Sequence, residues 1–347
     1  MCIRDGYSRQ PARDPVAWPL VSTWPWPAGS ATGIGSFPGT DIAEAVKLVL
    51  GDLPDLPHLP ELPARGPGAD LVGRTAGLLV DLPVEVYANR WRVAAHPGRD
   101  LRTTRDLWER DLDTLTAQAA GYEGAFKVQA AGPWTLAASL QLPVGGALLR
   151  DPGAVRDVTA SLAEGLRAHV ADVAARLPGA TILLQLDEPS LPAVLAGRVP
   201  TESGLGTLHP VESEVARDAL RGVVDAAQAP VVMHCCAPDV PLRLLAESGA
   251  AAVALDLDHV ADLDALGEAL DQGLGLVAGA ADPKAAAPSS AELASRVREL
   301  WNRLGFPVER LPRQVVVSPA CGLATATAAG ARAVLAACRD AGRRLLD

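Results

Sequence analysis

Residues 181–189 read TILLQLDEP, an apolar run that ends in two acidic residues and a proline. A run that is continuous rather than alternating is typical of a strand buried on both faces of a parallel sheet. Runs of this type recur along the chain, and together they predict eight strands. The predicted strands lie at 31–36, 78–84, 126–131, 181–186, 230–235, 251–255, 274–280 and 314–318.

Helical stretches follow nearly all of these strands. They lie at 41–50, 103–120, 151–176, 211–227, 241–248, 263–270, 290–304 and 325–346. Short strands that alternate with longer helices are typical of parallel βα units, and this pattern predicts a (β/α)8 TIM barrel of the α/β class. A doubly wound open sheet is the alternative. That fold usually carries a glycine-rich phosphate-binding turn, and the sequence has no convincing G-x-G-x-x-G or Walker motif.

The domain organisation follows from length and local composition. The chain has 347 residues, a length that α/β barrels often reach as one domain, so we predict a single barrel over 31–347. Residues 1–30 hold scattered charges followed by proline and tryptophan, and we expect a loose N-terminal extension there. The proline- and glycine-rich residues 51–73 are expected to form a long ordered loop, and long loops are often functional.

Composition and charge limit the class of protein. Hydrophobic residues make up 49% and charged residues 21%, so the chain can form a large core. The formal net charge of -10 argues against nucleic acid or an anionic membrane as the main partner, because phosphate groups are bound by clustered Lys and Arg. We see no continuous apolar run of about 18 residues and no signal-peptide pattern, so we expect a cytoplasmic protein.

Metal-binding side chains follow three of the predicted strands. His234 and Cys236 are two residues apart on an extended segment, so their side chains point to one face. Cys321 follows the eighth strand and Asp256 follows the sixth, at the end of a barrel where active sites lie. One imidazole, two thiolates and one carboxylate suit tetrahedral zinc. The alternative is a set of buried thiols and a satisfied core histidine, since five cysteines do not suggest a disulfide framework.

The spacing of these ligands favours a zinc ion that binds substrate. Structural zinc sites usually use short-spaced pairs such as C-x2-C, whereas these ligands come from distant strands. A thiol is the natural substrate ligand, because zinc deprotonates it and so makes it a nucleophile at neutral pH.

Two further segments suit the amino-acid part of a substrate. Of the adjacent acids Asp187 and Glu188, one is expected to face the pocket and hold an ammonium group while the other anchors the loop. A glycosidase-like acid–base pair or a helix cap are the alternatives. Ile34, Gly35 and Ser36 offer backbone groups and a hydroxyl to a carboxylate, or form a plain strand-to-helix turn. An amino acid with a thiol side chain fits all three features.

Four motifs occur in an order that resembles a known family. They are IGSFP at 34–38, QLDEP at 185–189, HCC at 234–236 and CGL at 321–323. The chain from about Ala31 onward resembles the C-terminal catalytic barrel of cobalamin-independent methionine synthase. The resemblance implies a Zn2+ cofactor bound by four residues, namely His234, Cys236, Asp256 and Cys321. The family usually has Glu at the third of these positions, so Asp258 is the alternative to Asp256.

The resemblance also implies a substrate and its contacts. It assigns the amino-acid part of homocysteine to Asp187 and to Ile34, Gly35 and Ser36, with Glu85 as a further candidate contact. The expected reaction is methyl transfer to homocysteine, giving methionine. A lyase similar to uroporphyrinogen decarboxylase, a non-catalytic zinc- or thiol-binding relative, and another thiol acceptor such as coenzyme M remain alternatives.

Two departures from the family concern the methyl donor. The family enzyme has a second, N-terminal barrel that helps to bind methyl-folate, and this chain is expected to be a short form without it. The family has a proton-donor histidine in a D-x-H segment after the seventh strand, where this chain reads Asp282-Pro283-Lys284. Lys284 and Asp282 are therefore the candidate catalytic residues. The donor is expected to be methyl-folate or a methyl-corrinoid, with a corrinoid protein as a candidate partner.

Overall fold

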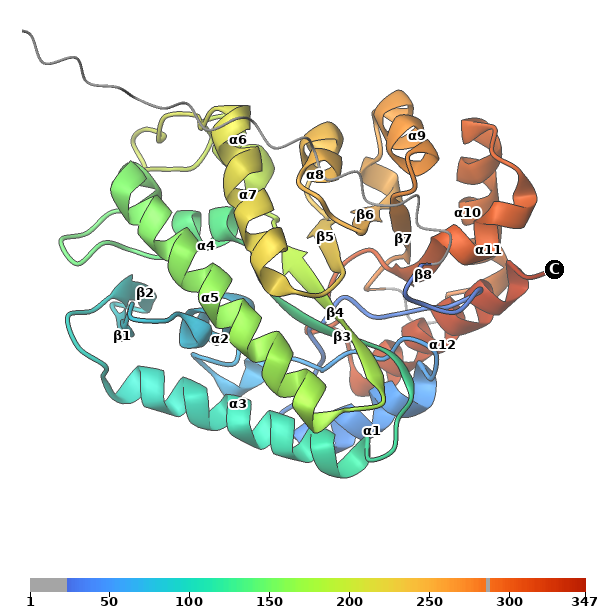
Figure 1. Cartoon of the computed structure of the whole chain (residues 1–347), viewed down its shortest axis with the longest axis horizontal. Coiled ribbons are helices and arrows are strands. Elements are labelled where there is room, and N and C mark those ends of the chain that lie inside the picture. Colours follow the sequence, from blue (N-terminus) through green and yellow to red (C-terminus); the bar gives the residue numbers. More distant parts are fainter. Residues whose placement is uncertain (1–23, 285–287) are drawn as a thin grey trace, which may run out of the picture.

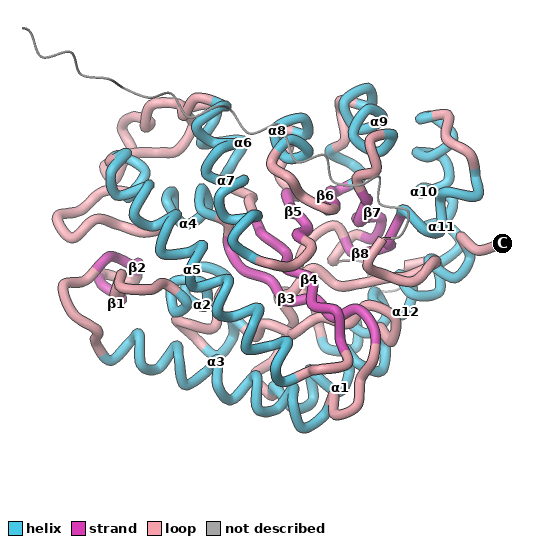
Figure 2. The backbone as a smooth tube through the Cα atoms, viewed as in Figure 1, coloured by secondary structure: helices cyan, strands magenta, loops and turns pink. Residues whose placement is uncertain are grey.

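A curled parallel sheet forms the centre of the molecule. The computed structural model describes residues 24–284 and 288–347. The six strands lie side by side in sequence order, every neighbouring pair is parallel, and the sheet curls visibly (Figures 1 and 2). The strands are β3 Gly124–Ala131, β4 Ala180–Asp187, β5 Val231–Cys235, β6 Ala252–Asp256, β7 Gly275–Ala281 and β8 Val315–Pro319. Their carboxyl ends therefore meet at one edge.

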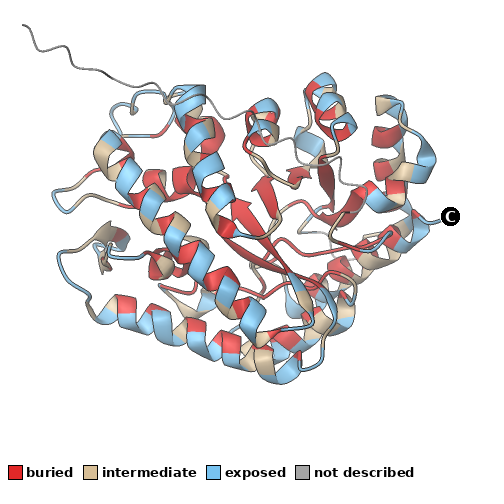
Figure 3. Ribbon diagram, viewed as in Figure 1, coloured by how far each residue is buried: buried red, intermediate tan, exposed pale blue. Residues whose placement is uncertain are grey.

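Helices cover the outer face of this sheet, and their outward sides are exposed while the strands are buried (Figure 3). The α-helices are α1 Ile42–Asp52, α2 Leu71–Leu78, α3 Arg99–Gln118, α4 Pro133–Ser139, α5 Pro152–Arg176, α6 Leu191–Leu195, α7 Ser213–Ala227, α8 Leu242–Glu247, α9 Leu263–Asp271, α10 Ser290–Leu304, α11 Leu311–Gln314 and α12 Ala328–Arg344. Short 3-10 helices lie at Pro63–Arg65, Leu148–Arg150, Leu257–His259 and Val308–Arg310. In the described part of the chain, no helix has the length and apolarity needed to cross a membrane.

Two extended segments lie between β8 and β3. Ala31 forms a parallel bridge with Val317 of β8. Ser36 then bridges to Glu61, and His58 bridges to Lys127 of β3. These contacts are isolated bridges rather than full ladders, so the structure shows a curled six-stranded sheet with two extended segments beside it. The eight-stranded barrel predicted from the sequence is therefore met in part.

The second predicted strand, 78–84, is wrong. Its first residue ends helix α2, and Val84 opens a two-stranded antiparallel hairpin formed by β1 Val84–Tyr87 and β2 Arg90–Val93, outside the parallel sheet. A short apolar run cannot be distinguished from a helix end by periodicity alone. The place beside β3 is taken instead by 57–61, within the segment that was expected to be a loop.

The prolines of 57–61 indicate a loop in the sequence, but they do not disrupt the extended conformation of this segment. The amide of Leu59 donates to the Lys127 carbonyl, and the amide of Glu61 donates to the Gly35 carbonyl. Pro57 contributes only its carbonyl, which accepts from the Lys127 amide. Proline is tolerated where its missing N–H is not needed by the ladder, so 57–61 can be extended despite a sequence that indicates a loop.

The inner face of the sheet is apolar at the amino ends of the strands. A small cluster fills it, made of Trp26, Leu56, Ala125, Leu183, Val232, Ala252, Ala254, Val277 and Val316. The indole N–H of Trp26 donates to the Arg313 carbonyl, and that of Trp24 donates to the Gly273 carbonyl. Of the extension predicted over 1–30, residues 1–23 lie outside the described residues, whereas Trp24 and Trp26 pack here. The polar side chains on the inner face of the sheet lie nearer the carboxyl ends of the strands.

Candidate active site at the carboxyl ends of the strands

Polar side chains on β3, β4 and β5 form a buried array inside the curl of the sheet. Strand side chains alternate, so Lys127 shares a face with Gln129, and Gln185 shares one with Asp187. The register places Gln129 opposite Gln185 and Asp187 opposite His234. All five side chains are buried, none of them more than 5% exposed. A polar layer therefore lies above the apolar layer at the amino ends.

A hydrogen bond with Asp187 orients His234. The Nδ1 atom of His234 lies 2.6 Å from Oδ1 of Asp187, which also accepts from Nε2 of Gln185 at 2.7 Å. An ionised carboxylate as acceptor places the imidazole proton on Nδ1, so Nε2 carries the free lone pair. This Nε2 is buried and has no hydrogen-bond partner among the described residues. Metal-binding histidines are commonly held in this way, by a carboxylate on the other ring nitrogen.

Two thiols approach each other beside this ring. The sulfur atoms of Cys236 and Cys321 are 3.3 Å apart, and both residues are partly exposed. The hydrogen bond between the two thiols and their burial raise the pKa of Cys236 above its ordinary range. The same hydrogen bond and the amide of Gly322 lower the pKa of Cys321 to about 6, although burial opposes this shift. The pair can therefore hold one negative charge. Cys235, by contrast, points into the apolar core.

The two candidate acids after β6 differ in their partners. Asp256 is mostly buried, and its carboxylate accepts from the amide of Asp258 at 2.9 Å and lies 3.4 Å from Nδ1 of His259. The same His259 atom lies 3.0 Å from the Cys236 carbonyl. Asp258 is exposed and pairs with Arg296 at 2.5 Å. Asp256 is therefore the acid that is connected to the cysteine segment.

The described residues show which predicted metal ligands come together. His234, Cys236 and Cys321 are neighbours, and Asp256 is linked to them through His259. Across 24–284 and 288–347, however, no group of three or more His, Cys, Asp or Glu side chains is already arranged to hold one metal ion.

The segment Ile34–Ser36 has all its carbonyls engaged. The Ile34 carbonyl accepts from Nε2 of Gln185 at 2.7 Å and from Nζ of Lys127 at 3.1 Å. The Gly35 carbonyl accepts from the Glu61 amide, and the Ser36 carbonyl accepts from the Leu323 amide. No hydrogen bond joins the amides of Ile34, Gly35 or Ser36 to another described residue. These amides are the groups that remain for an anionic ligand.

Gly322 brings this segment against the cysteine loop. A Cβ atom at this position would collide with Oγ of Ser36. Glycine at this position therefore lets the IGS and CGL motifs approach with the Ser36 side chain in its present position.

Glu188 anchors the loop after β4 rather than facing the site. Its carboxylate accepts from the amides of Trp134 and Thr135 at 2.9 and 2.8 Å and from the Thr135 hydroxyl at 2.7 Å. It therefore caps the start of α4 from a fully buried position. Burial raises its pKa to about 7, against the effect of these three donors. The two adjacent acids thus have separate roles, with Asp187 on the site side.

Sequence reasoning missed two buried charges in the polar array. Burial raises the pKa of Glu61 to about 7, with Arg74 opposing the shift and Asp187 adding to it. Burial lowers the pKa of Lys127 to about 8, with Asp187 and Glu61 opposing. A lysine inside an apolar run is the signal that could have revealed Lys127, because buried lysines are rare. Glu61 had no such signal, since its segment was interpreted as a loop.

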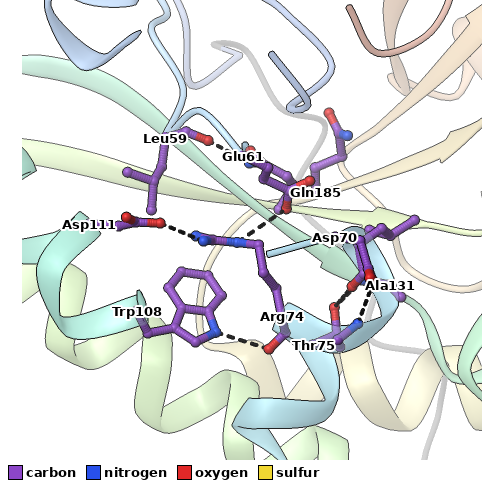
Figure 4. Close-up of polar contacts among 12 residues, drawn as sticks. Leu59, Glu61, Asp70, Arg74, Thr75, Trp108, Asp111, Ala131 and Gln185 are labelled. Carbon is purple, nitrogen blue, oxygen red and sulfur yellow. Dashed lines mark hydrogen bonds and ion pairs between the residues drawn. The ribbon is translucent and has the colours of Figure 1, made fainter. Parts of the chain in front are cut away.

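A second buried charge cluster lies behind Glu61 (Figure 4). Asp111 accepts from Arg74 at 2.5 Å and forms a two-pronged pair with Arg65 at 2.6 and 2.7 Å. The guanidinium of Arg74 lies 3.8 Å from the centre of the Trp108 ring, and its Nε is 3.8 Å from Glu61. This cluster fixes α2 and α3 against the extended segment 57–61, which carries Glu61.

The remaining predicted site residues lie apart from this array. Glu85 is on the β1–β2 hairpin, where Arg92 donates to it at 2.8 Å, and no hydrogen bond within the described residues joins it to the array. Asp282 and Lys284 follow β7 and are exposed, with the Lys284 amide donating to Asp282. An acid role for Lys284 at neutral pH would need burial to lower its pKa, and its side chain is exposed.

Known proteins resemble this chain at the level of family and fold. Residues 29–344 match the family described as "Cobalamin-independent synthase, Catalytic domain". The structure of a B12-independent methionine synthase from Shewanella sp. W3-18-1 in complex with selenomethionine superposes with a TM-score of 0.61 and 13% identity, over 92% of this chain and 98% of that chain. A psychrophilic glycoside hydrolase family 10 endo-β-1,4-xylanase reaches a TM-score of only 0.37 at 10% identity, over 83% of this chain and 85% of that chain. No curated protein sequence matches. Because the family match spans nearly the whole chain, this protein belongs to the cobalamin-independent synthase catalytic-domain family.

Proposed function

We propose that this protein is a zinc-dependent methyltransferase that moves a methyl group to the thiol of homocysteine and so forms methionine. The observation that carries the proposal is the arrangement of His234. Its ring is held by Asp187, its Nε2 is buried and unpartnered among the described residues, and two thiols 3.3 Å apart lie nearby. The family match and the fold of the methionine synthase from Shewanella support the same reaction class.

The donor set suits Zn2+. A neutral imidazole nitrogen and two thiols whose sulfur atoms lie 3.3 Å apart are the ligands that zinc prefers. His234, Cys236 and Cys321 would hold the ion, with Asp256 as the carboxylate ligand. Bound zinc would supply acidity, keeping a substrate thiol as thiolate at neutral pH.

The protein's own groups would bind the rest of the amino acid. Oδ2 of Asp187 has no hydrogen-bond partner among the described residues and would accept the substrate ammonium, with Glu61 as a second nearby carboxylate. The free amides of Ile34–Ser36 would donate to the substrate carboxylate. A new S–CH3 bond would form while the bond between the methyl group and its donor breaks, and the donor would keep the bonding electrons.

We also propose that the segments 30–36 and 57–61 act as the first two strands of a complete (β/α)8 barrel. The bridges from Ala31 to Val317, from Ser36 to Glu61 and from His58 to Lys127 support this arrangement. It would place Ile34–Ser36 and Glu61 on the same ring as the other site residues.

The methyl donor in this proposal is a methyl-corrinoid, free or on a corrinoid protein, rather than methyl-folate. The amine leaving group of methyl-folate needs a proton in the transition state, whereas a corrinoid cobalt leaves without one. The segment after β7 offers Lys284, which is exposed, where the family resemblance would place a histidine.

The test is methyl transfer by the purified protein together with its metal content. We expect about one zinc per chain and methionine formation from homocysteine and methylcobalamin. The Cys321→Ser variant should lose most of both. Cys338→Ser is the matched control, because Cys338 is a fully buried thiol on α12 that should affect only stability. No methionine from the native protein with either donor, or full zinc in Cys321→Ser, would show that the proposal is wrong.

A further inference from the structure

Gln185 connects the two groups proposed to bind the amino-acid part of the substrate. Its Nε2 atom donates to Oδ1 of Asp187 and to the Ile34 carbonyl, each at 2.7 Å. The side chain is fully buried. The opposite orientation of the amide would put its oxygen against two acceptors, so the hydrogen-bond network determines which atom is the nitrogen.

Lys127 supports the same carbonyl from the neighbouring strand. Its Nζ lies 3.1 Å from the Ile34 carbonyl oxygen, and the side chain is 1% exposed. A buried charge is costly unless its partners compensate it. The nearby carboxylates of Asp187 and Glu61 favour its charged form. The Ile34 carbonyl is thus held by two buried donors, and the proposed chemistry uses neither of them.

We propose that Gln185, supported by Lys127, is a positioning residue that makes the site selective for an α-amino acid. It fixes the Asp187 carboxylate, which receives the ammonium, relative to the Ile34–Ser36 amides, which receive the carboxylate. The carbonyls of this segment are all occupied within the protein, which fixes its backbone and leaves its amides available to a ligand. This inference rests on the proposed function, since it assumes an amino-acid substrate.

A purely structural role for Gln185 is the alternative, and the chain offers a matched control. Gln314 is also fully buried, and its Nε2 also donates twice, to the carbonyls of Leu270 and Leu274 at 2.7 and 2.8 Å. These bonds lie at the amino ends of β7 and β8, away from the site. Both Gln185→Leu and Gln314→Leu remove two buried hydrogen bonds donated by an amide, and Gln314→Leu also removes one accepted from Arg310, but only Gln185→Leu touches the proposed link.

Binding of product analogues gives the main measurement. We would measure the affinity of the full-length protein by calorimetry for L-methionine, for its 2-hydroxy analogue without the ammonium, and for its methyl ester without the carboxylate. The native protein should prefer L-methionine to both. Gln185→Leu should weaken L-methionine binding about 10-fold and reduce both preferences, because the hydrogen bonds lost are to a charged group and to the binding segment. Gln314→Leu should lower stability and keep both preferences.

Turnover and hydrogen exchange complete the test. Gln185→Leu should raise KM for homocysteine with a smaller change in kcat, as expected when a binding contact is lost. The amides of Glu61 and Leu323, which donate to Gly35 and Ser36, should exchange faster in Gln185→Leu than in Gln314→Leu. If Gln185→Leu does not fold, Lys127→Met provides the same comparison with a smaller loss of affinity.

The outcomes separate the two claims. A native protein that shows no preference for L-methionine over its analogues would refute the amino-acid substrate, and with it the inference. Preference in the native protein that survives unchanged in both Gln185→Leu and Lys127→Met would overturn the inference alone. Equal losses in Gln185→Leu and Gln314→Leu would also overturn it, because the effect would then be structural.

Discussion

Asp111 and Asp187 are both buried carboxylates, but the protein compensates their charges to different extents. Asp111 accepts three hydrogen bonds from two arginines, and both of its oxygens are occupied. Asp187 accepts from Gln185 and His234 through one oxygen, and its other oxygen has no partner among the described residues. A fully compensated charge stabilises a fold, whereas a half-compensated charge is available to a ligand. The difference separates structure from function within one molecule.

The largest effect is expected from breaking the compensated cluster. Asp111→Asn leaves Arg65 and Arg74 without their shared counter-charge, so the free energy of unfolding should fall by about 3–5 kcal/mol. Urea denaturation would measure this loss. The affinity of the folded fraction for L-methionine should change by less than about 2-fold, because the site does not share these bonds. A stability loss below about 1 kcal/mol would contradict the comparison.

Glu61 lies between the two carboxylates, and pH should reveal its position. Its pKa in the folded protein is about 7, above the ordinary value of 4.5, mainly because it is buried. The stability that its protonated form supplies is present below pH 4.5 and is lost as pH rises through 7. Glu61→Gln has no group to titrate at this position, so its free energy of unfolding should not show this loss. Between pH 4.5 and 7.5 the native protein should therefore lose up to about 3 kcal/mol more stability than the variant. If the free energies of unfolding of the two proteins changed equally with pH across this range, the raised pKa of Glu61 would be wrong.

Asp187→Asn should affect binding more than stability. The variant keeps the shape of the side chain but removes the charge offered to the ammonium group. L-methionine affinity should fall by about 10- to 150-fold, which corresponds to about 1.5–3 kcal/mol. Calorimetry on both proteins would measure it. Unchanged affinity would mean that the half-compensated carboxylate serves His234 alone.

The smallest effect is expected at Lys284. Its exposed side chain offers no buried acid, so Lys284→Met should leave methyl transfer from methylcobalamin within about 2-fold of the native rate. Assays with methylcobalamin and with methyl-folate would compare the donors. Strong methyl-folate activity that disappears in the variant would reverse the proposed donor preference.

The parallel sheet could be predicted from the sequence because β3 to β8 are continuous apolar runs. The grouping of polar residues at the carboxyl ends of the strands could also be predicted, since His234 lies near the end of β5 and Cys321 follows β8. The extended segment 57–61 could not be predicted, because prolines ordinarily indicate a loop. Whether a proline can be tolerated in an extended segment depends on which N–H groups the neighbouring strand needs. Glu61 was missed with it. The separate partners of Asp187 and Glu188 required three-dimensional contacts with β5 and α4.

The approach of Ser36 to Gly322 has a consequence for the order of synthesis. The segment from Ala31 to Ser36 emerges early from the ribosome, but two of its partners are made much later. They are Leu323, whose amide donates to the Ser36 carbonyl, and Val317 of β8, which bridges to Ala31. The early segment must therefore wait with its binding groups exposed while the intervening helices and strands fold. The candidate site is assembled only when synthesis has passed Leu323, so, under the proposed function, zinc loading should follow chain completion rather than guide it.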